Sequence, residues 1–309
     1  MILVLLGAGI EYSLAPLAEE ARRRGFTAIE VDMYKPDWRA KMDQTHPKKF
    51  TLVTSYHPFI DSWFHNKEFG TNLDMEALPA FIHRYQPGRT YFIPHDLTEP
   101  FKDDEIGALS KFDALFMPDG HHWYLGQYTA VYTVGWIKFA STTSLPIREL
   151  SFLPSELPYY IRHGRASFLR AFEPVLQLKP RIKLQPFPGI EEIEKVIGDF
   201  GCEVLPRDAD GGAILKSSKI MISNGISSVN LEMALLGVTG FCVEDGVHPK
   251  EEQIRHFGRI PNIGIGSAQE VQRLVKEALD GDDLVVAPNQ VTFDFDLVFE
   301  VITGAAAPR

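Results

Sequence analysis

Apolar runs and amphipathic stretches alternate along the chain. The first run, ILVLL at 2–6, is continuous and leads into the segment GAG, a pattern typical of a strand buried on both faces of a parallel sheet. The next segment, residues 12–24, spaces its apolar residues as a helix does and stops at Gly25. This order of strand and then helix recurs, which predicts a mostly parallel sheet with helices on both faces.

Two series of such units are separated by ASTTSLP at 140–146, a small, polar segment with the composition of a linker. We therefore predict an α/β fold with two Rossmann-like parallel-sheet domains that face a cleft, over residues 1–143 and 144–309. The last apolar stretch is expected to form a helix that packs back on the N-terminal domain. The predicted strands lie at 2–6, 27–33, 50–56, 90–97, 113–120, 149–154, 181–188 and 202–206, and on either side of a helix within 221–245.

The composition is that of an ordinary globular protein, with 45% apolar and 23% charged residues. No apolar run reaches the roughly 18 residues that a membrane span needs, and the N-terminal run lacks the flanks of a signal peptide. Cys202 and Cys242 lie in apolar, strand-like runs, so we interpret them as buried thiols and expect a cytoplasmic protein. The net charge of −10 makes nucleic acid an unlikely partner.

The stretch NGISS at 224–228 is the strongest candidate for a ligand site. The N–H groups at the start of a helix carry a partial positive charge and suit a diphosphate. Gly225 allows the backbone to approach a ligand, and Ser227 and Ser228 add hydroxyl donors. Because serine is also a favoured N-cap residue, the pattern alone leaves an ordinary helix cap as an equal interpretation.

Glu232 lies one helical turn beyond Ser228, which puts the two side chains on the same face. A carboxylate there can accept hydrogen bonds from both ribose hydroxyls of a nucleotide. The alternative is a glutamate that only favours the helix dipole, but the neighbouring residues are apolar and disfavour a merely solvated side chain. Ser155 ends the first strand of the second half and is expected to lie near the same phosphates.

His95 and Asp96 follow a predicted strand of the first half, at the end where parallel sheets bind ligands. Histidine accepts protons near neutral pH, so His95 is a candidate general base, which Asp96 would orient or replace. A loop histidine without a role is the alternative. His121 and His122 also follow a strand and are expected to line the cleft; adjacent residues point apart, so we expect no metal site there.

The segment KSSKIMISNGISSVNLEMALLGVTGFCVED, residues 216–245, resembles the nucleotide-binding segment of GT-B-type glycosyltransferases and their relatives. In those proteins a strand ends in a small-residue turn, here 223–225, and a helix starts with serine or threonine, here 227–228. A glutamate follows, here Glu232, and a glycine precedes the next strand, here Gly237. The segment is most similar to CDP-glycerol glycerophosphotransferase-like proteins and to the UDP-N-acetylglucosamine 2-epimerase group.

The chain departs from this pattern at two positions. A second histidine of the transferases is replaced by Gln185, and the glycine that follows their first histidine is replaced by Asp96. These departures affect the expected chemistry more than the expected fold.

The resemblance implies group transfer from a nucleotide-activated sugar or polyol phosphate to an acceptor hydroxyl, by a metal-independent enzyme that needs no cofactor beyond its donor. His95 and Asp96 would be catalytic. The donor would be bound by Ser155, Asn224, Gly225, Ser227, Ser228 and Glu232. A nucleotide-sugar 2-epimerase and a non-catalytic bilobal small-molecule binding protein are the alternatives. The expected partners are the donor and an unidentified acceptor, and a homodimer is kept as an alternative to a monomer.

Overall fold

The chain folds into two compact units, each built on a parallel sheet of six strands. The first unit combines Met1–Asp96, Pro100–Ser141 and Thr292–Arg309, and the second holds Leu97–Glu99 and Thr142–Val291. The computed structural model describes residues 1–7, 14–33, 35–45, 49–55, 78–94, 103–118, 120–140, 143–185, 187, 189–207, 209–258, 260, 262–281, 284, 286, 289 and 291–305. No helix in these ranges is long and apolar enough to cross a membrane.

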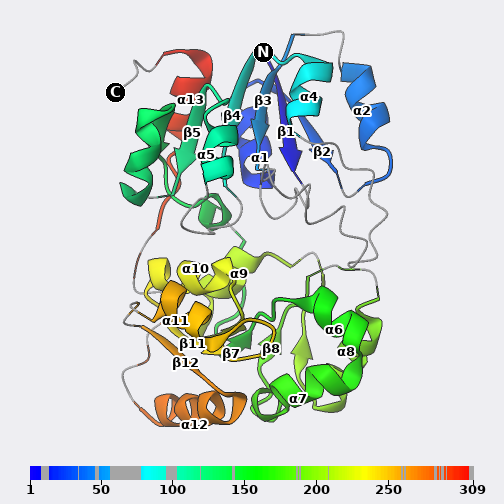
Figure 1. Ribbon diagram of the computed structural model, residues 1–309, viewed down its shortest axis with the longest axis vertical. Coiled ribbons are helices and arrows are strands. Elements are labelled where there is room, and N and C mark those ends of the chain that lie inside the picture. The colour runs from blue at the N-terminus through cyan, green and yellow to red at the C-terminus, as the bar shows by residue number, and fades with distance from the viewer. Residues whose placement is uncertain are drawn as a thin grey trace. The chain divides into compact units, whose positions relative to one another are not determined.

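The elements alternate along the chain as the hydrophobic pattern predicted (Figure 1). The strands are β1 (Ile2–Gly7), β2 (Thr27–Asp32), β3 (Thr51–Thr54), β4 (Arg89–Phe92), β5 (Ala114–Met117), β6 (Ala130–Thr133), β7 (Arg148–Phe152), β8 (Arg181–Ile182), β9 (Glu203–Val204), β10 (Ser218–Asn224), β11 (Thr239–Val243) and β12 (Ile263–Gly266). The helices are α1 (Ala15–Arg23), α2 (Trp38–Thr45), α4 (Leu78–Tyr85), α5 (Asp103–Leu109), η3 (Gly120–Gln127), η4 (Ile137–Ala140), α6 (Leu157–His163), α7 (Arg165–Leu176), α8 (Glu191–Asp199), α9 (Gly211–Lys216), α10 (Ser228–Leu236), α11 (Lys250–Phe257), α12 (Ala268–Leu279) and α13 (Phe295–Thr303).

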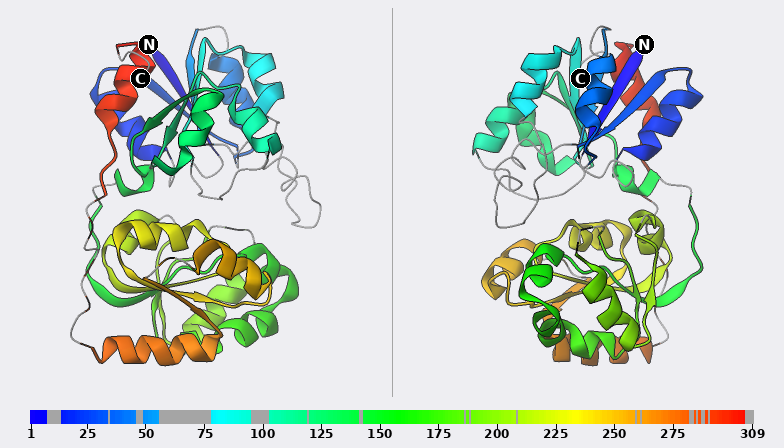
Figure 2. Two further views of the ribbon diagram at one scale, coloured as in Figure 1. Left: turned by 60° about the vertical axis from the view of Figure 1, so that its left-hand side comes forward. Right: turned by 90° about the vertical axis from the view of Figure 1, so that its right-hand side faces the viewer.

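The first sheet has the strand order β2-β1-β3-β4-β5-β6 and is buried on both faces. Successive side chains of a strand point to opposite faces, and β1 shows this directly. Val4 and Leu6 belong to one core cluster with residues of α2 and α4, whereas Leu3 and Leu5 belong to another with residues of α1 and α13. Figure 2 shows these two pairs of helices on opposite sides of the sheet.

Helix α13 returns from the end of the second unit to complete the first. The ring of Phe299 stacks on that of Phe26 with 5.3 Å between the centroids, and the Arg24 guanidinium lies 4.7 Å from the centre of the Phe299 ring. Arg24 also forms an ion pair with Asp296. The backbone N–H of Asp294 donates to the Val134 carbonyl at 2.7 Å, so the returning segment runs beside the end of β6.

The second sheet has the order β12-β11-β10-β7-β8-β9, and all of its pairs are parallel. From β7 the chain moves outward through β8 and β9, then crosses back to β10 and continues in the opposite direction through β11 and β12. The order therefore reverses between β7 and β10. In open parallel sheets, ligands bind outside the carboxyl ends of the strands at such a point.

Candidate functional site

The turn that follows β10 begins the candidate site. β10 ends at Asn224, and Gly225 has a φ of 63°, in the left-handed region that glycine adopts without strain. Ser227 is then the N-cap of α10, because its Oγ accepts a hydrogen bond from the Val229 N–H at 3.3 Å. The helix starts at Ser228, as the sequence predicted.

Asn224 joins the turn to two other loops. Its side chain is fully buried, and its Oδ1 accepts from the Ser155 N–H at 2.7 Å. Its Nδ2 donates to the Ser155 carbonyl at 3.3 Å and to Asp245 Oδ2 at 2.6 Å. Ser155 Oγ returns a hydrogen bond to the Asn224 carbonyl at 2.6 Å. Asn224 thus connects the loop after β7 with the loop after β11, the two strands that flank β10.

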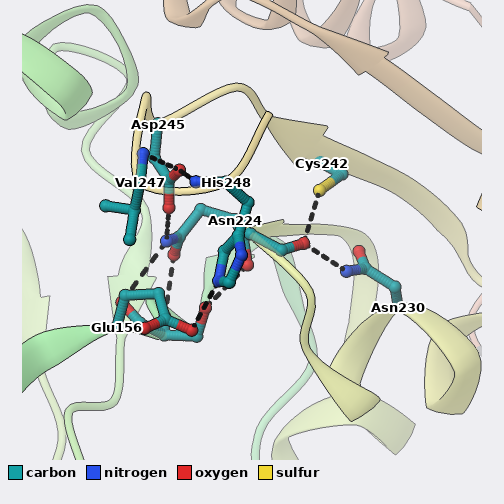
Figure 3. A network of polar contacts seen from close by, with 9 residues as sticks. Glu156, Asn224, Asn230, Cys242, Asp245, Val247 and His248 are labelled. Atoms are coloured by element: carbon teal, nitrogen blue, oxygen red, sulfur yellow. Dashed lines mark hydrogen bonds and ion pairs between the residues drawn. The ribbon is translucent and has the colours of Figure 1, made fainter. Parts of the chain in front are cut away.

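The Gly225 carbonyl is held from the other side by Cys242 and Asn230 (Figure 3). Cys242 Sγ lies 3.4 Å from this oxygen and Asn230 Nδ2 lies 3.5 Å from it. Burial raises the pKa of Cys242 to about 12, so the group remains a protonated thiol that donates. The Asn230 amide oxygen accepts in turn from Ser223 Oγ. The turn is therefore rigidly fixed.

The loop after β11 sends two side chains toward the turn, as Figure 3 shows. Asp245 reaches Asn224, and its Oδ1 accepts from the Val247 N–H at 2.9 Å, which shapes the loop. His248 Nε2 lies 3.1 Å from Oε1 of Glu156, which comes from the loop after β7. Three loops from neighbouring strands thus converge on one point.

The start of α10 offers a second set of polar groups. Ser227 occupies the Val229 N–H through its side chain and the Asn230 N–H through its carbonyl. Among the described residues, the N–H of Ser228 has no acceptor, as expected for the first residue of a helix. Ser228 Oγ lies 3.4 Å from Glu232 Oε1, so the two side chains share a face as their spacing predicted. Glu232 is only 2% exposed.

Not every predicted site residue can be placed. His95 and Asp96 lie outside the described residues, beyond the carboxyl end of β4 in sequence. His121 and His122 belong by their backbone to η3, but their side chains are outside the description. The structure brings together Ser155, Asn224 and Gly225 in one network, and Ser227, Ser228 and Glu232 along the first turns of α10.

The sequence patterns did not point to Glu156, Asp245 and His248 as site residues. A signal was present, because each residue follows the carboxyl end of a strand, within CVEDGVHP or LPSE. Their importance depends on β7 and β11 being the two neighbours of β10, which the hydrophobic pattern does not reveal. Within the described part of the chain, no group of three His, Cys, Asp or Glu side chains is arranged to hold a metal ion.

Comparison with known proteins shows the fold. No protein-family profile matches the chain, and no curated protein matches it in sequence. A variant of the wall teichoic acid polymerase TagF soaked with CDPG has a TM-score of 0.57 at 10% identity, over 92% of this chain and 79% of that chain. A Listeria monocytogenes protein described as a UDP-N-acetylglucosamine 2-epimerase has a TM-score of 0.53 at 10% identity, over 100% of this chain and 97% of that chain.

These similarities confirm the predicted fold class, two parallel-sheet α/β domains. At sequence identities near 10%, these similarities show a shared fold but not a shared activity. The chain shares its architecture with TagF and with the Listeria protein described as a UDP-N-acetylglucosamine 2-epimerase.

Proposed function

We propose that the protein is a group transferase that binds a nucleotide-activated sugar or polyol phosphate at the carboxyl edge of its second sheet. The observation that carries this proposal is the position of the turn 224–227 and the start of α10, beside the point where the strand order reverses. The N–H of Ser228, which has no acceptor in the part of the chain that the structure describes, and the helix dipole favour a diphosphate there. Asn224 positions the turn and does not contact the donor itself, since its side-chain oxygen and nitrogen already form hydrogen bonds within the protein.

In the proposed reaction the acceptor hydroxyl oxygen forms a bond to the transferred group while the bond between that group and the nucleotide breaks. The nucleotide leaves with the electron pair of that bond, and the start of α10 stabilises its negative charge. A base takes the proton of the acceptor hydroxyl, and His95, with Asp96 beside it, is the candidate that we propose for this role.

A nucleotide-sugar 2-epimerase is the second candidate. It is supported by one observation, the Listeria protein described as such an enzyme, which matches this chain over nearly the full length of both. Epimerisation needs acid and base groups around the sugar ring, and Glu156, Asp245 and His248 supply titratable side chains at the second sheet.

Incubation with a panel of nucleotide-activated sugars and polyol phosphates separates these functions. A transferase releases a nucleotide and yields a new acceptor product, whereas an epimerase converts the sugar of an intact donor. Binding without either product would identify a non-catalytic binding protein. Absence of binding to every member of the panel would contradict both catalytic proposals.

Replacing Glu232 with glutamine is expected to weaken nucleotide binding by roughly 10- to 150-fold, because a hydrogen bond to a charged group contributes about 1.5–3 kcal/mol. Calorimetric titration with the preferred nucleotide measures the change. Glu270→Gln is the matched control, since Glu270 lies in the first turn of α12, another serine-capped helix of the same unit. Wild-type affinity in a folded Glu232→Gln protein would show that Glu232 is structural only.

A further inference from the structure

The contact between His248 and Glu156 covers the turn where the proposed donor phosphates would bind. A side chain built on Gly225 would place its Cβ 3.1 Å from His248 Cδ2, 3.3 Å from Asp245 Oδ2 and 3.4 Å from Glu156 Cγ. Gly225 has no side chain of its own to block a ligand. In the fold, however, three other side chains occupy the space beside it. Two of them are carboxylates, which repel a diphosphate.

Glu156 is held in an unfavourable backbone conformation to make this contact. Its φ is 57°, in the left-handed region, although it is not glycine. Such outliers persist where the surrounding structure requires them, and they cluster at functional sites. The side chains of Glu156 and His248 are 15% and 24% exposed, so their ion pair is largely shielded but still reached by solvent.

Tyr160 supplies an independent observation at the same point. It lies four residues beyond Glu156 on α6 and is 1% exposed, and its hydroxyl makes no hydrogen bond of good geometry in the described part of the chain. Burial raises the pKa of Tyr160, and the charges of Asp245 and Glu156 and a loose contact of the hydroxyl with Asp245 raise it further. Among the described residues, the buried hydroxyl therefore lacks a well-aligned acceptor.

We propose that His248 is a phosphate-binding side chain of the donor site, and that Glu156 holds it until the phosphate of the donor replaces the carboxylate as its partner. The exchange moves no proton between His248 and the ligand and breaks no covalent bond. This inference rests on the proposed nucleotide-donor function and adds to it the residue that neutralises the phosphate charge.

Substitutions of His248 and Glu156 are expected to change the affinity for a nucleoside diphosphate in opposite directions. His248→Gln removes the cation and is expected to weaken binding of a nucleoside diphosphate at pH 6 by roughly 10- to 150-fold. Glu156→Gln removes a competing and repelling charge and is expected to strengthen it by about 5-fold, the effect of unit charges about 4 Å apart in water. A purely structural pair would shift both affinities in the same direction.

The test is calorimetric titration of UDP, CDP, GDP and ADP, and of inorganic pyrophosphate, at pH 6 and pH 8. Wild-type protein is expected to bind more tightly at pH 6, because imidazole gains its charge between pH 8 and pH 5. Among the described residues, the titratable groups near His248 include Glu156, Asp245 and Tyr160. The preference for pH 6 should be lost in His248→Gln, where the phosphate of the ligand is still a titrating group.

His248→Lys and His163→Gln complete the set. The lysine variant keeps a cation and should bind pyrophosphate with little pH dependence. It tests the role of the positive charge even if the glutamine variant fails to fold. His163 is the last residue of α6, at the end away from Glu156, and its ring lies 4.2 Å from that of Tyr159 at a tilt of 38°, so its replacement should change nothing.

Equal affinity of wild type and folded His248→Gln would overturn the inference while the nucleotide-donor function stood. Equal weakening by His248→Gln and Glu156→Gln would also overturn it. Pyrophosphate binding that depends on His248 without binding of any nucleotide would support the anion site and contradict the proposed function. If neither nucleotide nor pyrophosphate binds to wild type, both proposals fail.

Discussion

Replacing His95 with alanine is expected to lower turnover by about 10²–10⁴-fold and to leave nucleotide affinity nearly unchanged. The reason is that a general base acts on the acceptor hydroxyl in the transition state, whereas the proposed nucleotide site belongs to the second sheet. Single-turnover kinetics and calorimetric titration of the same preparation measure the two quantities separately.

Asp96→Asn and His83→Ala accompany this measurement. The asparagine variant tests whether Asp96 is the base itself. If it is, Asp96→Asn should lower turnover more than His95→Ala does. His83 is an exposed histidine on α4 and serves as the matched control, with no expected effect. Parallel losses of affinity and turnover in His95→Ala would contradict its assignment as the base.

Replacing Gly225 with valine is expected to lower the free energy of unfolding of the second unit by about 2–5 kcal/mol. Two costs add here. The left-handed backbone conformation disfavours any residue with a Cβ, and most of all a β-branched one. The new side chain must also displace His248, Asp245 and Glu156, which already lie 3.1–3.4 Å from the Cβ position.

Gly201→Val separates the two costs. Gly201 has a similar φ of 71°, and nothing lies within 4 Å of its Cβ position. Its replacement should therefore show the backbone cost alone, about 1–2 kcal/mol. Chemical denaturation monitored by circular dichroism compares the variants. A Gly225 variant no less stable than the Gly201 variant would show that the three side chains move aside without cost.

Several strands that the sequence predicted correctly have continuous apolar runs. β1 and β10 each combine such a run with a small-residue turn at the carboxyl end, which is a local signal. β12 was missed because its sequence is IGIG, and glycine weakens a strand signal. The fold explains these glycines, since a Cβ on Gly264 would approach the Phe241 ring to 3.0 Å. Packing between neighbouring strands selected a residue that local propensity disfavours.

The candidate site also combines features that depend on neighbouring residues in the sequence with features that depend on the fold. The helix start at Ser228, with Ser227 as its cap, was predictable because capping depends on residues that are close in sequence. The network around it was not, because Ser155 and Asn224 are 69 residues apart and Glu156 and His248 are 92 apart. Only the order of the strands brings these residues together. The roles of Ser155, Asn224, Gly225, Ser227, Ser228 and Glu232 in donor binding stay predictions.

The return of α13 affects how the protein forms during synthesis. Val298, Phe299 and Ile302 cover the face of the first sheet that carries Leu3 and Leu5. Translation produces α13 only after the whole of 142–291, so this apolar face lacks one of its covering helices while the second unit emerges from the ribosome. The second unit is contiguous apart from residues 97–99 and can complete its core first. We therefore expect the first unit, although its strands are made earlier, to reach its native packing after the second, and the apolar face that α13 covers to be open to aggregation until then.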